Sequence, residues 1–296
     1  MDFLKEKRLS LKRFRTYDTQ DSVQPRDVEV QSARSISESG FSSWRAFKKY
    51  IMTDVDPSRC TAILTAYCFL TGITDAVSFT AIFIWCGFMT GNTVQLALSL
   101  GRIFSPSDGD LTFRTMDKQS LTALCCFAIG ILLGRIGDRI GAHTRLWLFL
   151  GTMLQTLFIM GAAITTWKGN QPSVAEARDS PAWTQNITFL AIALMSAALG
   201  LQGIMAKRIP SQFGTTVVLT TVWVELVGDP HLFKLRHVPS RDHRILEIAF
   251  FFLGAVFGRA LLDQIGSAGT LGIGTAIRFV VALFWLAVPE KPFEEQ

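Results

Sequence analysis

Charged residues are scarce in this sequence, because Asp, Glu, Lys and Arg together make up only 18% of its 296 residues. Soluble domains usually carry about a quarter charged residues. The charge is also uneven: much of it lies in the first 56 residues, while residues 146–167 and 245–262 hold almost none. Since 49% of the chain is hydrophobic, the composition argues against an ordinary soluble domain and favours a membrane protein.

Catalytic and cofactor-binding motifs are also missing. The sequence lacks a Ser-His-Asp set, an HExxH motif, a phosphate-binding glycine loop and a dinucleotide fingerprint. Its five cysteines lie in or beside apolar segments without CxxC spacing, so we expect them to act as small hydrophobic side chains. His231, His237 and His243 are six residues apart and share no helical face, so we expect no metal site. We therefore expect no cofactor and no enzymatic activity.

Long apolar runs make up most of the chain. A helix needs about 20 residues to cross roughly 30 Å of hydrocarbon, and only helices or closed barrels satisfy their backbone groups in lipid. The runs are too long for barrel strands. We therefore predict an all-α membrane protein, a polytopic helical bundle within the lipid bilayer.

Eight apolar elements can be distinguished, and two of them are short. They are expected at residues 60–81, 90–104, 120–140, 145–167, 187–207, 214–227, 244–265 and 270–288. If the short elements, 90–104 and 214–227, enter only part of the bilayer, the chain has about six full spans. If both cross it, there are eight. We favour six spans plus two short interrupted elements.

The two halves of the chain resemble each other. Residues 127–135 match residues 251–259 at an offset of 124, and residues 91–96 match 214–219 at an offset of 123. Chance similarity among apolar segments is the alternative, but two motifs in the same order favour an internal repeat, a common design in secondary transporters. The first motif carries pairs of glycines that predict close helix packing: Gly130 and Gly134, then Gly254 and Gly258.

The polar segments complete the predicted organisation. We expect a disordered basic tail at 1–40, an amphipathic interfacial helix at 41–56, a first transmembrane half at 57–167, a polar loop at 168–186, a second half at 187–289 and a C-terminal tail at 290–296. The basic tail predicts a cytoplasmic N-terminus, and we favour the plasma membrane. The net charge of +5 comes mainly from this tail and from short loops, so we expect no nucleic-acid partner.

Two short stretches carry a family resemblance. Residues 71–79, TGITDAVSF, followed by residues 89–94, MTGNTV, resemble the signature of the YoaK-type family of uncharacterised multi-pass membrane proteins, and residues 200–203 look like the second-half counterpart. The basic tail and the loop at 168–185 resemble fungal members. The resemblance covers roughly residues 62–288. It implies an integral membrane protein with six spans and brings no substrate with it.

Asp75 is the sharpest signal for function. It lies well inside the first apolar segment, where a charge costs at least about 2.5–3.5 kcal/mol, so it normally faces a cavity or a partner. A carboxyl that gains and loses a proton during a transport cycle fits this place. A structural side chain hydrogen-bonded to a neighbouring helix is the alternative.

Arg278 lies near the centre of the last span. Its guanidinium cannot shed a proton, so it needs a carboxylate or an anionic ligand. Asp75 and Glu225 are the candidate counter-charges, and an Asp75–Arg278 pair would join the first span to the last. Such a pair could also be purely structural.

The short elements supply polar groups at helix breaks. A broken helix presents unpaired N–H groups that can hold an anion, although helix capping and small-residue packing are the alternative. The candidate binding side chains are Thr90, Asn92 and Thr93 in the first half and Thr215 and Thr216 in the second.

These features favour a secondary transporter or permease for a small polar or anionic solute, with Asp75 able to couple it to protons. A non-catalytic membrane scaffold or assembly factor is the first alternative, and an intramembrane enzyme is the second. The sequence leaves the solute and the oligomeric state open.

Overall fold

The computed structural model describes residues 44–104, 112–177, 180–211, 213, 215–217 and 219–291. The chain divides into two units, Met1–Tyr50 and Ile51–Gln296. In the first unit, residues 44–50 are helical and exposed, within the range predicted for the amphipathic helix. The tail predicted at 1–40 lies outside the described residues. All that follows concerns the second unit.

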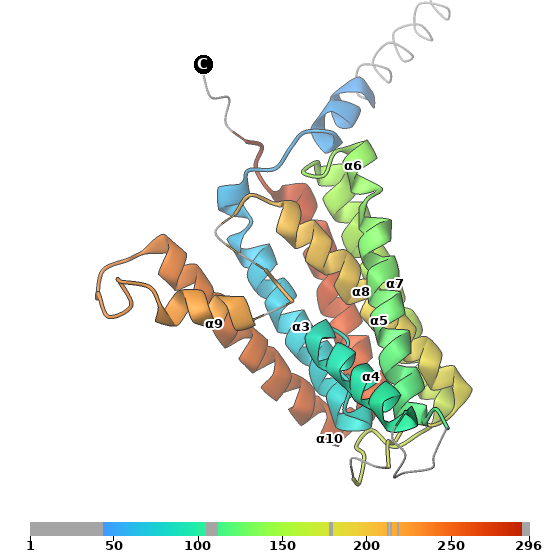
Figure 1. The fold of residues 1–296 in the computed structure, drawn as a ribbon. Coiled ribbons are helices and arrows are strands. Elements are labelled where there is room, and N and C mark those ends of the chain that lie inside the picture. Colours follow the sequence, from blue (N-terminus) through green and yellow to red (C-terminus); the bar gives the residue numbers. More distant parts are fainter. Residues whose placement is uncertain are drawn as a thin grey trace, which may run out of the picture. The chain divides into compact units, whose positions relative to one another are not determined.

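The regular structure of this unit, as far as it is described, is helical (Figure 1). Five helices are long and apolar enough to cross a membrane, namely α3, α5, α7, α8 and α10, which is consistent with an integral membrane protein. The elements are η1 (Pro57–Arg59), α3 (Thr61–Ile82), α4 (Met89–Ile103), α5 (Thr115–Gly134), α6 (Gly137–Ile140), α7 (Arg145–Gly169), α8 (Asn186–Arg208), α9 (Thr220–Val227) and α10 (Pro239–Ala287).

The outer surface of the bundle is apolar along these helices. Large side chains such as Leu132, Phe252 and Phe284 are 57%, 64% and 57% exposed. In water such a surface would drive association, whereas hydrocarbon tails are as apolar as these side chains. The pattern of exposure therefore agrees with the membrane prediction made from the length of the apolar runs.

Helix α10 reverses direction at Gly266. This residue has φ 68° and ψ −177°, a backbone conformation open to glycine but strained for other residues. Both parts of α10 contact the same stretch of α3: Phe251 lies against Gly72, and the Trp285 Nε1 donates to the Tyr67 hydroxyl over 3.0 Å. In one straight helix, residues 251 and 285 would be about 50 Å apart. The chain therefore folds back on itself, as the two separate apolar segments predicted.

The helix termini gather at two ends of the bundle. The backbone N–H groups of Val55 and Asp56, just before α3, donate to the carbonyls of His143 and Pro289. His143 in turn contacts the carbonyl of Arg208 at the end of α8. We name this the basic end, because it carries Arg59, Arg139, Arg145, Arg208 and Arg241. At the opposite end, loop residues Ala175 and Ala182 donate to the last turn of α3.

The loop between α7 and α8 also fixes the reversal of α10. The Ser173 hydroxyl accepts a hydrogen bond from the Ser267 backbone N–H over 2.8 Å. It thus satisfies a donor that the helix following Gly266 leaves free in its first turn. The opposite end is therefore built around one long connection that touches both α3 and α10.

Two helix crossings bring backbone against backbone. A Cβ atom added at Gly72 would lie 2.1 Å from the Phe251 carbonyl oxygen, and one at Gly254 would lie 2.0 Å from the Phe69 carbonyl oxygen. The same reciprocal contact joins α5 to α8. There, a Cβ atom at Gly130 would lie 2.1 Å from the Ala197 oxygen.

The remaining glycines predicted to pack helices are also crowded. A Cβ atom at Gly134 would lie 2.1 Å from Cγ2 of Ile204, and one at Gly258 would lie 3.0 Å from Cα of Ile73. The glycine motifs therefore sit where α3 meets α10 and where α5 meets α8.

Candidate functional site

Among the described residues, the most deeply buried cation is Arg278, on the second part of α10. It is 1% exposed. Its Nη1 donates to the side-chain oxygens of Gln155 on α7 and Gln202 on α8, over 2.5 and 2.7 Å. Its Nε and Nη2 have no hydrogen-bond partner among the described residues. Two donors of a charged group are thus left unsatisfied in the interior.

Other buried polar side chains surround Arg278. The Gln202 Nε2 donates to the Thr71 hydroxyl over 2.8 Å and to the Thr216 hydroxyl over 3.3 Å. The Tyr67 hydroxyl lies 2.6 Å from that of Thr152. Together they form what we call the central cluster, which consists of Tyr67, Thr71, Thr152, Gln155, Gln202, Thr216, Arg278 and Trp285. It joins α3, α7, α8 and α10 to the segment before α9.

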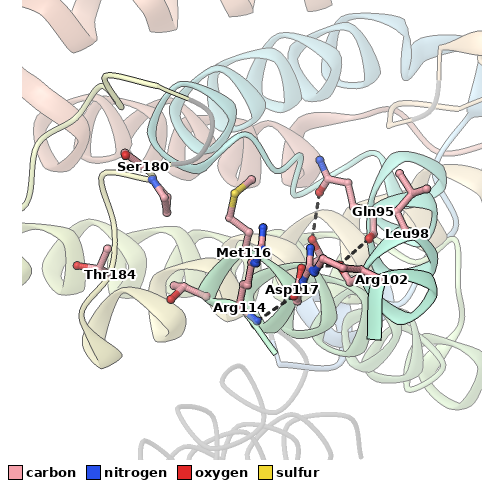
Figure 2. Close-up of a pocket in the computed structure, with 12 residues that line it drawn as sticks. Gln95, Leu98, Arg102, Arg114, Met116, Asp117, Ser180 and Thr184 are labelled. Atoms are coloured by element: carbon pink, nitrogen blue, oxygen red, sulfur yellow. Dashed lines mark hydrogen bonds and ion pairs between the residues drawn. The ribbon is translucent and has the colours of Figure 1, made fainter. Parts of the chain in front are cut away.

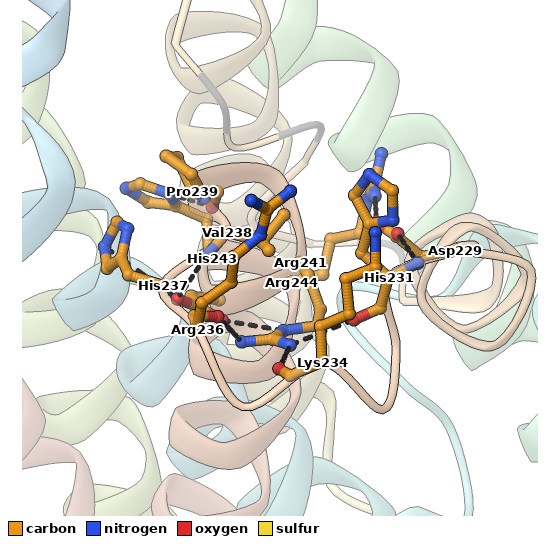
Figure 3. Close-up of polar contacts among 11 residues, drawn as sticks. Asp229, His231, Lys234, Arg236, His237, Val238, Pro239, Arg241, His243 and Arg244 are labelled. Atoms are coloured by element: carbon orange, nitrogen blue, oxygen red, sulfur yellow. Dashed lines mark hydrogen bonds and ion pairs between the residues drawn. The ribbon is translucent and has the colours of Figure 1, made fainter.

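Neither predicted counter-charge pairs with Arg278. Glu225 instead lies 3.1 Å from the Arg244 Nε, because α9 leads the chain back to the start of α10. Arg244 also binds Asp229 (Figure 3). Asp75 bonds to backbone rather than to a cation. Within the described part of the chain, Arg278 has no Asp or Glu side chain at ion-pair distance, so the expectation of an Asp75–Arg278 pair was wrong.

Asp75 holds the broken connection between α3 and α4. Helix α3 ends at Ile82 and is followed by Phe83, whose φ of 58° is left-handed. The chain then turns back, so that the Gly87 N–H donates to the Asp75 Oδ1 over 2.9 Å. The carboxyl is 5% exposed. In an unbroken helix the Gly87 N–H would donate to a backbone carbonyl; here the Asp75 carboxyl accepts this hydrogen bond instead.

The irregular segments before α4 and α9 meet inside the bundle. Cγ1 of Val217 lies 3.2 Å from the place that a Cβ atom on Gly87 would take. Next to Val217, Thr216 accepts hydrogen bonds from Thr71 and Gln202 of the central cluster. The two segments therefore touch between Asp75 and Arg278, which are two of the three intramembrane charges singled out from the sequence.

The other predicted binding residues do not all lie at the contact between the segments before α4 and α9. Asn92 is buried; its Nδ2 donates to the Trp85 carbonyl over 2.6 Å, while its Oδ1 has no partner among the residues described. Thr90 and Thr93 are exposed. Thr215 is half-buried, and its hydroxyl accepts from the Val217 N–H. Of the predicted set, Thr216 and Arg278 belong to the central cluster, Asp75 lies one turn of α3 beyond Thr71, and Glu225 lies elsewhere.

Sequence reasoning missed the uncharged members of the cluster other than Thr216. Gln155 lies in an apolar run without any charge and is fully buried, as is the hydroxyl of Thr152 one turn earlier. The rule that ionisable residues inside a membrane mark functional places drew attention to Asp75 and Arg278. Applied to amides as well, it would have identified Gln155 and Gln202.

A polar cavity of about 580 Å³ lies between α4, α5 and the loop before α8 (Figure 2). On one wall, the Asp117 carboxylate accepts from the Ser99 hydroxyl, from Arg102 Nη2 over 2.5 Å and from the Arg114 backbone N–H over 2.8 Å. The Gln95 side chain, on the same wall, accepts from Ser120 over 3.0 Å. These contacts tie the end of α4 to the start of α5.

Replacing Asp117 with alanine is expected to lower the free energy of unfolding by about 2 kcal/mol, because three donors lose their acceptor. The loss is limited because the Arg102 side chain is partly exposed and can be hydrated instead. The apparent unfolding temperature in detergent, followed by size-exclusion chromatography after heating, should fall by several degrees. Lys118→Ala is the matched control, since this neighbour is exposed. An equal effect of both substitutions would show that the Asp117 contacts do not stabilise the fold.

The loop before α10 is organised by one arginine (Figure 3). Arg241 donates to the backbone carbonyls of His231, Lys234 and Arg236 and pairs with Asp242. The histidines of this region bind separate partners, since His243 lies 3.1 Å from the Thr61 hydroxyl and His237 lies 3.8 Å from Asp242. In the described ranges no group of three or more His, Cys, Asp or Glu side chains could hold a metal.

Comparison with known proteins gives a family and no activity. The family model described as "Protein of unknown function (DUF1275)" matches residues 63–284. This is consistent with the YoaK-type resemblance of the two sequence stretches. No match was found among curated proteins, and none among solved structures.

Proposed function

We propose that the chain, which belongs to the DUF1275 family of proteins of unknown function, is a secondary transporter for a small polar or anionic solute. The family assigns no activity, so the proposal depends on the site. The observation that carries it is the contact between Gly87 and Val217, where two interrupted segments meet among buried polar side chains. Interrupted helices near the bilayer midplane are the usual binding sites of secondary transporters.

The proposed topology has six spans in two inverted halves. Counting α10 as two spans, α3 and the first part of α10 start at the basic end, while α5 and α8 start at the opposite end. The segment before α4 enters from the opposite end and the one before α9 from the basic end. The first half thus runs opposite to the second, which is how one duplicated unit would be placed on the two sides of a central site.

The positive-inside rule orients the protein. Since the basic end collects most of the arginines in the described loops, we place it in the cytoplasm together with the N-terminus, and the cavity of Figure 2 on the other side. We favour the plasma membrane, where a solute could be exchanged with the exterior.

Buried polar groups support a transporter over a scaffold. Polar side chains inside a membrane are costly and gather where a solute or ion passes. The central cluster contains a guanidinium and two amides that are almost fully enclosed. A scaffold would need none of them, because small-residue faces such as those of Gly72 and Gly254 suffice for helix contacts.

The test is solute flux in liposomes containing the purified full chain. A labelled panel of monocarboxylates, nitrate, chloride, sulfate, phosphate, amino acids and polyols should yield at least one solute that enters faster than into empty liposomes. Gln202→Leu should reduce that flux about tenfold or more, because four hydrogen-bonding partners lose their contact and each is worth about 1 kcal/mol.

Gly101→Ala is the control, since the added methyl group meets no atom within 4 Å. Folded protein that moves no solute of the panel would overturn the proposal. An unchanged flux in a folded Gln202→Leu variant would remove the central cluster from the pathway.

A further inference from the structure

We infer that the central cluster binds one small monovalent anion through two of its oxygen atoms, a carboxylate or a planar oxyanion, at the Nε–Nη2 edge of Arg278. The inference rests on the proposed function, because it names the class of solute that would be carried.

The geometry of the unsatisfied donors selects this edge. Nη1 is occupied by Gln155 and Gln202, whereas Nε and Nη2 have no hydrogen-bond partner among the described residues. Nε–H and one Nη2–H point the same way in the guanidinium plane. A carboxylate binds such an edge through two parallel hydrogen bonds. The two free donors are thus the pair that recognises two oxygens of one anion.

The charge of the cluster sets the valence of the ligand. Arg278 is its only charged member, and the groups that contact it are neutral amide oxygens. A buried unpaired charge is costly, and an opposite charge at hydrogen-bonding distance relieves that cost. One negative charge would make the cluster neutral, whereas two would leave a net negative charge in the interior. A monovalent anion is therefore favoured over sulfate or a dicarboxylate.

The amide of Gln155 offers a further donor. Its Nε2 donates to the sulfur of Met205, over 3.2 Å, and a thioether is a weak acceptor; it also interacts with the Tyr67 hydroxyl. An anion could replace the contact with the sulfur at little cost. The acceptor side of the same amide is already held by Arg278, so the side chain is oriented by the residue that would bind the ligand.

Enclosure favours a free anion over a lipid headgroup. Gln155 and Gln202 are fully buried, and Arg278 is 1% exposed. A headgroup would have to bring its acyl chains through the bundle, whereas a small anion can be enclosed completely. The proposed site is therefore enclosed in this structure, next to the segment that carries Val217.

Thermal unfolding of the full chain in detergent tests the inference, with sodium formate, acetate, nitrate, chloride and sulfate at constant ionic strength. At least one of formate, acetate or nitrate should raise the Tm in a saturable manner, by more than chloride or sulfate does. Arg278→Gln should abolish this rise. Arg259→Gln, which removes an exposed arginine paired with Asp263, should retain it.

Equilibrium dialysis of the unaltered protein against the radiolabelled form of the anion that raises the Tm keeps the test independent of how the variants fold. One mole bound per mole of chain is expected, and Arg278→Lys, which keeps the charge but loses the edge, should weaken binding at least tenfold. Absence of saturable binding by any of the five anions would overturn the inference, as would equal binding in a folded Arg278→Gln variant.

The two proposals fail in distinguishable ways. Flux of a neutral solute in liposomes without anion binding would overturn the anion site and leave the transporter standing. One bound anion per chain without flux of any solute would keep the site and overturn the transporter.

Discussion

Gly254→Ala is expected to lower the stability of the protein by about 3 kcal/mol or more and to remove most of the folded protein from detergent extracts. The new Cβ atom would lie 2.0 Å from the Phe69 carbonyl oxygen. Because that atom belongs to the backbone of α3, no side-chain rotation can relieve the clash, and the two helices must move apart. Overpacking in a close-packed interior typically costs about 1–3 kcal/mol even where side chains can adjust. Fluorescence-detected size-exclusion chromatography measures the folded fraction.

Gly272→Ala in the same helix is the matched control. Its added methyl group meets nothing within 4 Å, and alanine is the better helix former by about 1 kcal/mol, so its stability should be equal or slightly higher. Gly130→Ala should behave like Gly254→Ala, because its clash is with the Ala197 backbone. Equal elution profiles for Gly254→Ala and Gly272→Ala would contradict the close crossing of α3 and α10.

Asp75→Asn is expected to leave the fold intact and to abolish proton-driven accumulation of the solute. The asparagine oxygen can still accept the Gly87 N–H that the carboxylate accepts over 2.9 Å, but the amide cannot take up or release a proton. Asp75→Ala should in addition lose about 1–3 kcal/mol of stability, because the buried Gly87 N–H is left without its acceptor.

Two transport modes separate the structural role of Asp75 from the functional one. Counterflow, which needs no proton movement, should persist in Asp75→Asn, while accumulation driven by a pH gradient should fall to the level of empty liposomes. Asp263→Asn, an exposed carboxyl on α10, should change neither. If Asp75→Asn still accumulates solute at the normal rate, Asp75 serves only to hold the turn at Gly87.

The helices themselves were largely predictable from the apolar runs. The segments expected at 145–167 and 187–207 are observed as α7 (Arg145–Gly169) and α8 (Asn186–Arg208). Helix α5 begins five residues earlier than expected. Its first turn is polar and lies outside the apolar run, but Asp117 in that turn accepts hydrogen bonds from three donors. Helix α9 begins only at Thr220, and Thr216 before it instead contacts α3 and α8.

The partners of the buried charges were not predictable, for a physical reason. A sequence shows that Arg278 and Asp75 lie inside apolar segments. An ion pair between them is the simplest way to offset the cost of burying both charges. Which side chains meet depends on helix rotation and on where the chain breaks, and neither can be read from composition. The observed partners are two glutamine oxygens for Arg278 and a backbone N–H for Asp75.

The tight glycine crossings have a mechanical consequence. They lock α3 to α10 and α5 to α8 through backbone contacts that cannot slide without a clash. Between these two helix pairs, the interior combines apolar packing of α3, α8 and α10 side chains with the hydrogen bonds of the central cluster. Examples are the hydrogen bonds of Gln202 with Arg278 and with Thr71. Rocking of one helix pair against the other would therefore break the hydrogen bonds of the central cluster, and would leave the crossings within each pair unchanged.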